Sequence, residues 1–373
     1  MLETNLTTAR RLIFGEEEST GARALVAALG VTLALLVLTF LLAPTYVLPV
    51  LGMALGVVAV GWITHQAVIA RLLTFVATVF TVLTVAFITY FLFASAMPAV
   101  LEHGTGLFVI PVENGQVRWF FWLDALLPAG ESTWNPSADV YSLVPTIWAT
   151  VIVTVIAGAV AGPLGLFGAL FIAEIASDGV REFIKPGVEI LAGIPSIVYG
   201  FIGFQVLNGF VQTSFLDDGA SFLIAGVTVG VMALPTVVSV AEDALSSVPD
   251  SMRDGSIAIG ATRWQTMKSI SIPAAFSGIS AAVILGLGRA IGETMAVAAI
   301  MAAGVGLADP LYDVFDASAT LTSLIATQYG SASESTLDVL FVAGVLLFGI
   351  VAGMSVVSKY IEKRMQQKLK GDQ

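Results

Sequence analysis

The chain of 373 residues has no cysteine, two histidines and few charged side chains. The lack of cysteine excludes disulfides, thiolate catalysis and cysteine-ligated metals, although it does not identify a compartment. No His-Glu-x-x-His pair, Gly-x-Ser-x-Gly elbow or Gly-x-x-x-x-Gly-Lys-Ser/Thr phosphate-binding loop occurs. The sequence therefore predicts a protein that is not an enzyme, has no metal site and has no cofactor of its own.

What the chain has in excess is apolar sequence. Hydrophobic residues make up 57% and charged residues 12%, and the mean hydropathy is +0.92. This leaves too little polar surface to cover a soluble globule, so we predict an all-α, polytopic membrane protein. Eight apolar runs reach the roughly 20 residues that a spanning helix needs. These predicted spans are 24–43, 45–64, 72–97, 145–171, 188–211, 221–240, 273–303 and 339–357.

The basic residues predict the orientation. Eight spans place fourteen of the sixteen Lys and Arg residues on one side, which the positive-inside rule assigns to the cytoplasm. Both termini are then expected in the cytoplasm, and the protein itself in the cell membrane. The first two spans are read as an uncleaved hairpin. The domain prediction is an N-terminal segment with this hairpin at 1–71, a permease core at 72–358 and a cytoplasmic tail at 359–373.

The net charge of −11 argues against nucleic-acid binding, because most basic residues flank spans. Acidic residues are concentrated in the predicted outer loops, where they would repel a free anion. An anionic cargo would therefore arrive on a carrier protein; alternatively, the acidity is an adaptation to high salt. The outer loop 98–143 carries Trp119, Trp122 and Trp134. These tryptophans are interpreted either as interface anchors or as part of a docking surface for such a carrier.

Arg289 and Glu293 are four residues apart within the predicted span 273–303. On one continuous helix they would share a face and pair, and Arg289 would lie about 24 Å along the span from Pro273. Charge within the membrane is costly and usually faces an aqueous path or the protein interior. The pair therefore indicates transport of something polar, with a purely structural ion pair as the alternative.

The longest predicted cytoplasmic loop, 241–272, has the pattern helix, glycine, helix. Ser251 with Asp254, and Thr262 with Gln265, are predicted N-terminal caps. Gly260 separates the two helices. We expect Pro273 in the first turn of the next span, where its missing N–H costs little.

This loop resembles the EAA loop of ABC importer permeases. The similar residues are Asp254-Gly255-Ser256, Gly260 and the terminal Ile270-Ser-Ile-Pro273, although Asp, Gly and Ser stand where Glu, Ala and Ala are usual. Three further strings resemble the phosphate-specific ABC permease family of the PstC type. They are Ala258-Ile-Gly-Ala-Thr-Arg-Trp264, Gly288-Arg-Ala-Ile-Gly-Glu-Thr-Met-Ala-Val297 and Leu191-Ala-Gly-Ile-Pro-Ser-Ile-Val-Tyr-Gly200.

The resemblance implies a type I importer core of six helices, to which the N-terminal hairpin is an addition. It further implies a PstA-like sister permease, an ATPase dimer that carries ATP and Mg, an extracytoplasmic phosphate-binding protein and a lipid-embedded core. The expected coupling residues are Asp254, Gly255, Gly260, Arg263, Trp264, Ile270 and Pro273.

The expected translocation residues are Arg289, Glu293, Thr294 and Ser196. Glu293 is expected to neutralise Arg289 until an anion competes for it. Ser196 lies beside Pro195 in the span 188–211, where helix packing is the alternative to a role in the path. The alternative functions are a permease for molybdate, tungstate or sulfate, and an ion-coupled secondary transporter, which would leave the pattern from Gly260 to Pro273 unexplained.

Overall fold

The computed structural model describes residues 19–111, 117–119, 134–214, 220–301 and 304–371. The chain divides into two compact units, Met1–Phe91 and Leu92–Gln373, with the division inside one long helix. In the described residues, six helices are long and apolar enough to cross a membrane, and two sharply bent helix pairs bring the number to eight if each pair is one span. The prediction of a helical membrane protein is therefore confirmed.

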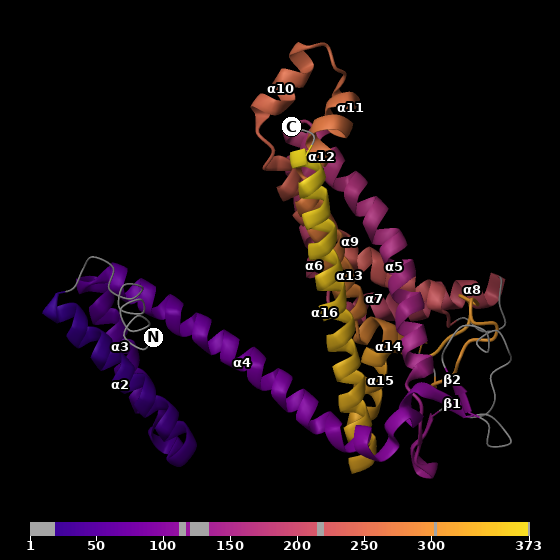
Figure 1. Ribbon diagram of the computed structural model, residues 1–373, viewed down its shortest axis with the longest axis horizontal. Helices are drawn as coiled ribbons and strands as arrows, with labels where there is room; N and C mark the ends of the chain where they lie inside the picture. The colour runs from indigo at the N-terminus through magenta and orange to yellow at the C-terminus, as the bar shows by residue number, and fades with distance from the viewer. Residues whose placement is uncertain (1–18, 112–116, 120–133, 215–219, 302–303, 372–373) are drawn as a thin grey trace. The chain divides into compact units, whose positions relative to one another are not determined.

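The first unit is built on a helical hairpin (Figure 1). It contains α2 (Thr20–Leu42), a 3-10 turn (Pro44–Tyr46), α3 (Val47–Thr64) and the first part of α4 (Gln66–His103). Ser19 caps α2 by accepting a hydrogen bond from the Ala22 N–H at 3.1 Å. Gly61 of α3 leaves no room for a side chain beside Leu25 and Ile69. Close helix packing and a 3.1 Å hydrogen bond between the Ser19 hydroxyl and His65 Nε2 hold this hairpin together.

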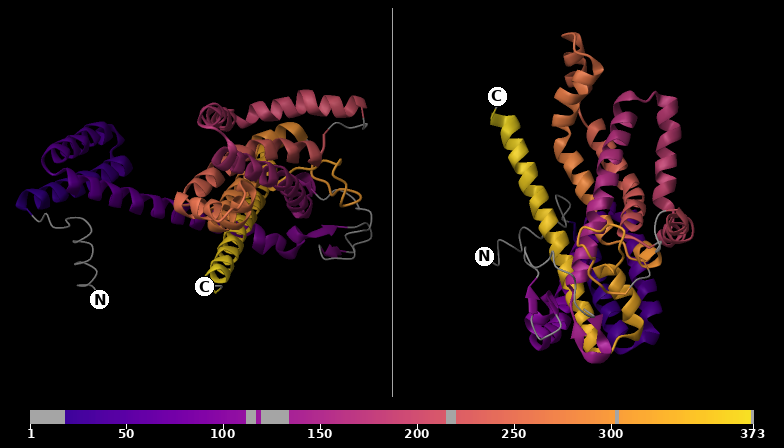
Figure 2. Two further views of the ribbon diagram at one scale, coloured as in Figure 1. Left: turned by 90° about the horizontal axis from the view of Figure 1, so that it is seen from above. Right: turned by 90° about the vertical axis from the view of Figure 1, so that its right-hand side faces the viewer.

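The second unit is a helical bundle with two small antiparallel ribbons (Figures 1 and 2). The ribbons are β1 (Val109–Pro111) with β2 (Val117–Trp119), and β3 (Trp134–Asn135) with β4 (Val140–Tyr141). The helices up to the long loop are α5 (Val144–Leu170), α6 (Asp178–Gly193), α7 (Ser196–Ile202), α8 (Gly209–Ser214) and α9 (Phe222–Ser246). The remaining helices are α10 (Asp250–Ala258), α11 (Arg263–Thr266), α12 (Ile272–Ala274), α13 (Phe276–Ile291), α14 (Met295–Met301), α15 (Leu321–Gln328) and α16 (Glu334–Gly371).

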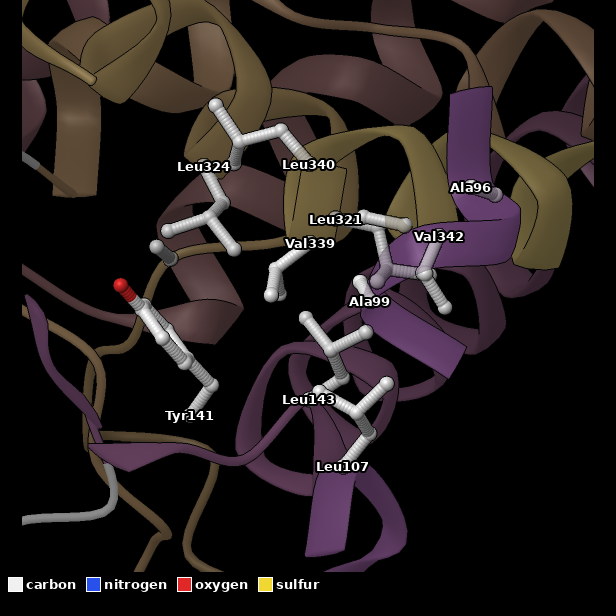
Figure 3. Close-up of a cluster of buried hydrophobic side chains, with 12 residues drawn as sticks. Ala96, Ala99, Leu107, Tyr141, Leu143, Leu321, Leu324, Val339, Leu340 and Val342 are labelled. Atoms are coloured by element: carbon white, nitrogen blue, oxygen red, sulfur yellow. The ribbon is translucent and has the colours of Figure 1, made fainter. Parts of the chain in front are cut away.

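The centre of this bundle is the contact between α5 and α9. A Cβ at Gly226 would lie 2.6 Å from Ile156, and one at Gly230 would lie 2.8 Å from Val160. Both glycines therefore let the two helices approach closely. Figure 3 shows a second cluster, in which the end of α4 meets α15 and the start of α16 around Leu321.

Two predicted spans are not continuous helices. The predicted span 188–211 includes an 87° bend between α6 and α7, at Ile194 and Pro195. The span predicted at 273–303 begins next to a 73° bend at Ala275 and is interrupted again between α13 and α14. Proline, which lacks an N–H, accounts for the first bend.

Candidate translocation and coupling sites

The break between α13 and α14 separates Arg289 from Glu293. Helix α13 ends at Ile291, and α14 begins at Met295. The Glu293 carboxylate accepts a hydrogen bond from the Ala296 N–H at 3.2 Å. It thus satisfies one of the free N–H groups at the start of α14. The prediction of one helix through 273–303 is wrong because α13 ends at Ile291 and a separate helix, α14, begins at Met295. Backbone carbonyls still accept from the Gly292 and Glu293 N–H groups, and the Glu293 side chain serves the start of α14.

Two hydroxyl groups hold the same break. The Thr322 hydroxyl donates to the Glu293 carbonyl at 2.8 Å, and the Thr294 hydroxyl donates to the Gly292 carbonyl at 3.2 Å. The segment between α13 and α14 is therefore an ordered turn, tied to α15 through Thr322. Irregular backbone of this kind is tolerated within a membrane where the protein itself satisfies the freed groups.

Arg289 lies in the last turn of α13, half-buried, and points to α9. Its Nη1 donates to the Thr236 hydroxyl at 3.3 Å. Within the described part of the chain no carboxylate forms an ion pair with Arg289, so the predicted pairing with Glu293 is wrong in this structure. One hydrogen bond to a neutral hydroxyl leaves most of the five guanidinium N–H donors available.

Arg289 lines an open cavity of about 730 Å³ between α9, α13 and α16. The lining consists of Thr236, Ala281, Ile284, Leu285, Gly288, Arg289, Val351, Met354, Ser355, Ser358 and Lys359. Glu293, Thr294 and Ser196 are not part of it. Ser196 begins α7 directly after Pro195 and is half-buried. The four predicted translocation residues therefore do not line one cavity. Arg289 lines it, Glu293 and Thr294 bond the backbone at the break between α13 and α14, and Ser196 is the first residue of α7.

The predicted coupling loop contains a helical hairpin of α10 and α11 that projects from the end of the second unit where α16 also ends (Figure 1). Gly260 has φ +88°, a left-handed conformation that favours glycine. Thr262 and Gln265 form the predicted capping box of α11. The other predicted cap is wrong: α10 begins at Asp250 after Pro249, so Ser251 lies inside the helix. The prediction for Pro273 is wrong: it lies in α12, at the end of the helical segment Arg263–Ala274, and the next span helix, α13, begins after the 73° bend, at Phe276.

The tip of this hairpin exposes the side chains that a docking partner would meet. Asp254, Gly255, Arg263 and Trp264 are all exposed, and Ile270 is half-buried in a π-helical turn. Apolar side chains are exposed as well, among them Ile259 at 87% and Trp264 at 59%. Exposed apolar groups of this kind are typical of interaction surfaces.

Sequence reasoning missed the residues that attach this hairpin to the bundle. Arg253 of α10 makes a 3.2 Å ion pair with Glu174, which lies in a π-helical extension of α5, and donates to the Leu245 carbonyl at 2.6 Å.

A second sheltered carboxylate, Glu242 of α9, pairs with two residues of α6, Lys185 at 2.8 Å and Arg181 at 3.2 Å. The signal in the sequence was an acidic residue near the end of a long apolar run.

These features define a polytopic helical membrane protein with a charged cavity and an exposed helical hairpin. The chain matches the family model "Binding-protein-dependent transport system inner membrane component" over residues 161–367. Because this match covers more than half of its length, the chain belongs to that family.

Curated relatives extend the match. The chain is 42% identical over 212 residues to the probable ABC transporter permease protein YqgH of Bacillus subtilis, covering 55% of this chain and 68% of the relative. It is 31% identical over 255 residues to the phosphate transport system permease protein PstC of Xylella fastidiosa, covering 63% and 78%. The probable phosphate transport system permease protein PstC of Methanocaldococcus jannaschii is 29% identical over 299 residues, covering 74% and 87%.

A crystal structure of a bacterial alginate ABC transporter, in complex with a periplasmic protein bound to an alginate pentasaccharide, supports the fold. Its matching chain superposes with a TM-score of 0.52 and 14% identity, covering 81% of this chain and 98% of that one. At this level of identity the likeness concerns the fold alone, and that fold is the one of ABC importer permeases.

Proposed function

We propose that the chain is the PstC-type permease subunit of an ATP-driven importer of inorganic phosphate. The names of its curated relatives support the cargo. The observation that carries the mechanism is Arg289, a cation in the bundle that hydrogen-bonds a neutral hydroxyl and faces a cavity. A phosphate oxyanion leaving water needs such donors, and the planar guanidinium fork suits its oxygens.

In this account the roles of the neighbouring residues follow from their contacts. Thr236 orients the guanidinium through the hydrogen bond to Nη1. Glu293 positions the break after α13 by capping α14 and does not neutralise Arg289. An arriving anion then meets an arginine that no carboxylate has to release, so binding needs no exchange of ion-pair partners.

The exposed hairpin over α10 and α11 is the docking surface for a separate ATPase, which hydrolyses ATP with Mg. A PstA-like permease completes the pathway, and a phosphate-binding protein delivers the anion from the outside. The hairpin and the C-terminus lie at one end of the second unit (Figure 1). With both termini in the cytoplasm, this end faces the ATPase.

The test is ATP-dependent uptake of labelled phosphate by vesicles that contain this chain, the sister permease, the ATPase and the binding protein. We expect uptake that needs ATP and that excess sulfate or molybdate does not block. Uptake without ATP would refute the ATP-driven mechanism. Block by sulfate or molybdate would instead assign the same permease to a different oxyanion.

A further inference from the structure

The cavity beside Arg289 contains a second cation. Lys359 of α16 lines the same cavity, together with the hydroxyls of Thr236, Ser355 and Ser358. The lining includes no carboxylate, and in the described part of the chain no acidic side chain forms an ion pair with Lys359. The rest of the lining is mainly aliphatic. A cleft of one charge sign with low-dielectric walls concentrates its field and raises the local concentration of counter-ions.

The two cations come from different depths of the bundle. Arg289 is half-buried in the last turn of α13, whereas Lys359 is exposed, near the C-terminal end of α16. Figure 2 (right) shows the C-terminal half of α16, in yellow, diverging from the neighbouring orange helices of the bundle. The cavity is therefore bounded by one half-buried and one exposed cation.

We propose that this cavity is a release site for the transported oxyanion, in which Lys359 receives the anion from Arg289 at the cytoplasmic side. The inference rests on the proposed phosphate import and adds a residue to it. A flexible ammonium is suited to this step because it attracts an anion as a point charge, without the bidentate grip of arginine. The anion then leaves from a site where solvent competes for it.

The natural absence of cysteine permits a direct test. Ser355 lies one turn before Lys359 and lines the same cavity, and its hydroxyl bonds only its own helix, at the Val351 carbonyl. In the assembled importer, Ser355→Cys is labelled with an anionic and, separately, a cationic methanethiosulfonate reagent. Labelling of this chain is read from its mass. A second variant combines Ser355→Cys with Lys359→Gln. The control combines Ser355→Cys with Lys363→Gln, because Lys363 lies one turn beyond the residues that line the cavity.

We expect Lys359→Gln to lower the ratio of anionic to cationic labelling rates about tenfold, because a unit charge one helical turn away acts on the two reagents in opposite directions. Lys363→Gln should change the ratio less than about twofold, since its charge is roughly a Debye length from Ser355. Millimolar phosphate should slow anionic labelling at least about threefold when Lys359 is present and not in Lys359→Gln.

The same oxyanion chemistry occurs in lipid headgroups, so the labelling is repeated in neutral phosphatidylcholine and in vesicles with anionic phosphatidylglycerol. Protection by free phosphate in neutral vesicles supports the release site. Protection that requires the anionic lipid, or a ratio that Lys359→Gln leaves unchanged, overturns it. Phosphate uptake is measured on the same vesicles: uptake without protection refutes only the release site, whereas wild-type vesicles that take up no phosphate refute the proposed function.

Discussion

Removing the Arg253 side chain should detach the coupling hairpin from the bundle. Its pair with Glu174 is mostly sheltered, with side-chain exposures of 17% and 10%. Arg253→Met leaves the Glu174 carboxylate without this partner, which for a buried pair costs about 3–5 kcal/mol. Because the pair is partly exposed, we expect a smaller cost of about 2–4 kcal/mol. This figure already includes the lost hydrogen bond to Leu245, since the two losses are not additive. The pair with Asp250, which is 88% exposed, contributes at most about 1 kcal/mol.

The loss should appear in two measurements. If the anchored hairpin is the form that the ATPase binds, about 2–4 kcal/mol of lost anchoring weakens ATPase affinity by about thirtyfold to several hundredfold. The detergent-solubilised permease should also unfold at a lower temperature. Glu174→Gln combined with Arg253→Met should be less damaging than Arg253→Met alone, because no unpaired carboxylate remains.

The control is Asp250→Asn, which removes only the exposed partner and should leave ATPase affinity within about twofold of wild type. Wild-type ATPase affinity together with an unchanged unfolding temperature in Arg253→Met would refute the anchoring role of this ion pair.

Substitutions at three further positions test local structure. Glu293→Gln keeps an oxygen for the Ala296 N–H and should retain most transport, whereas Glu293→Ala should lose about 1 kcal/mol of stability; equal loss of transport in both would restore Glu293 as a charge partner. Gly260→Ala should cost about 1–2 kcal/mol through its positive φ and weaken ATPase docking, with Gly260→Asn milder; equal docking in all three forms would contradict this. Gly226→Val meets Ile156 and should lower the unfolding temperature by overpacking, which a melting curve would show; an unshifted curve would argue against this close contact.

Much of the architecture could be predicted from the sequence because membrane spans are recognised by the length and apolar composition of a run of residues. The hairpin of α2 and α3 followed from such patterns. The capping box at Thr262 was equally local, since both partners are three residues apart. These features depend on neighbours along the chain, which a single sequence displays.

The misplaced features depend on contacts between distant segments. An apolar run with Arg289 and Glu293 predicts one helix by periodicity, yet Thr322, from a separate helix, bonds the backbone at the break. Likewise, the Thr236 hydroxyl, 53 residues before Arg289 in the chain, accepts a hydrogen bond from the guanidinium, which was expected to pair with Glu293. Helix spacing showed which residues could pair, and tertiary contacts determined which did.

The most direct test of the account is phosphate uptake by the reconstituted importer with Arg289→Gln, with Arg289→Lys as the charge-preserving comparison. The account predicts that Arg289→Gln abolishes uptake while the ATPase still binds, and that Arg289→Lys retains a small fraction because its ammonium cannot form the planar fork. Undiminished phosphate uptake by Arg289→Gln would contradict the claim that this guanidinium binds the transported anion.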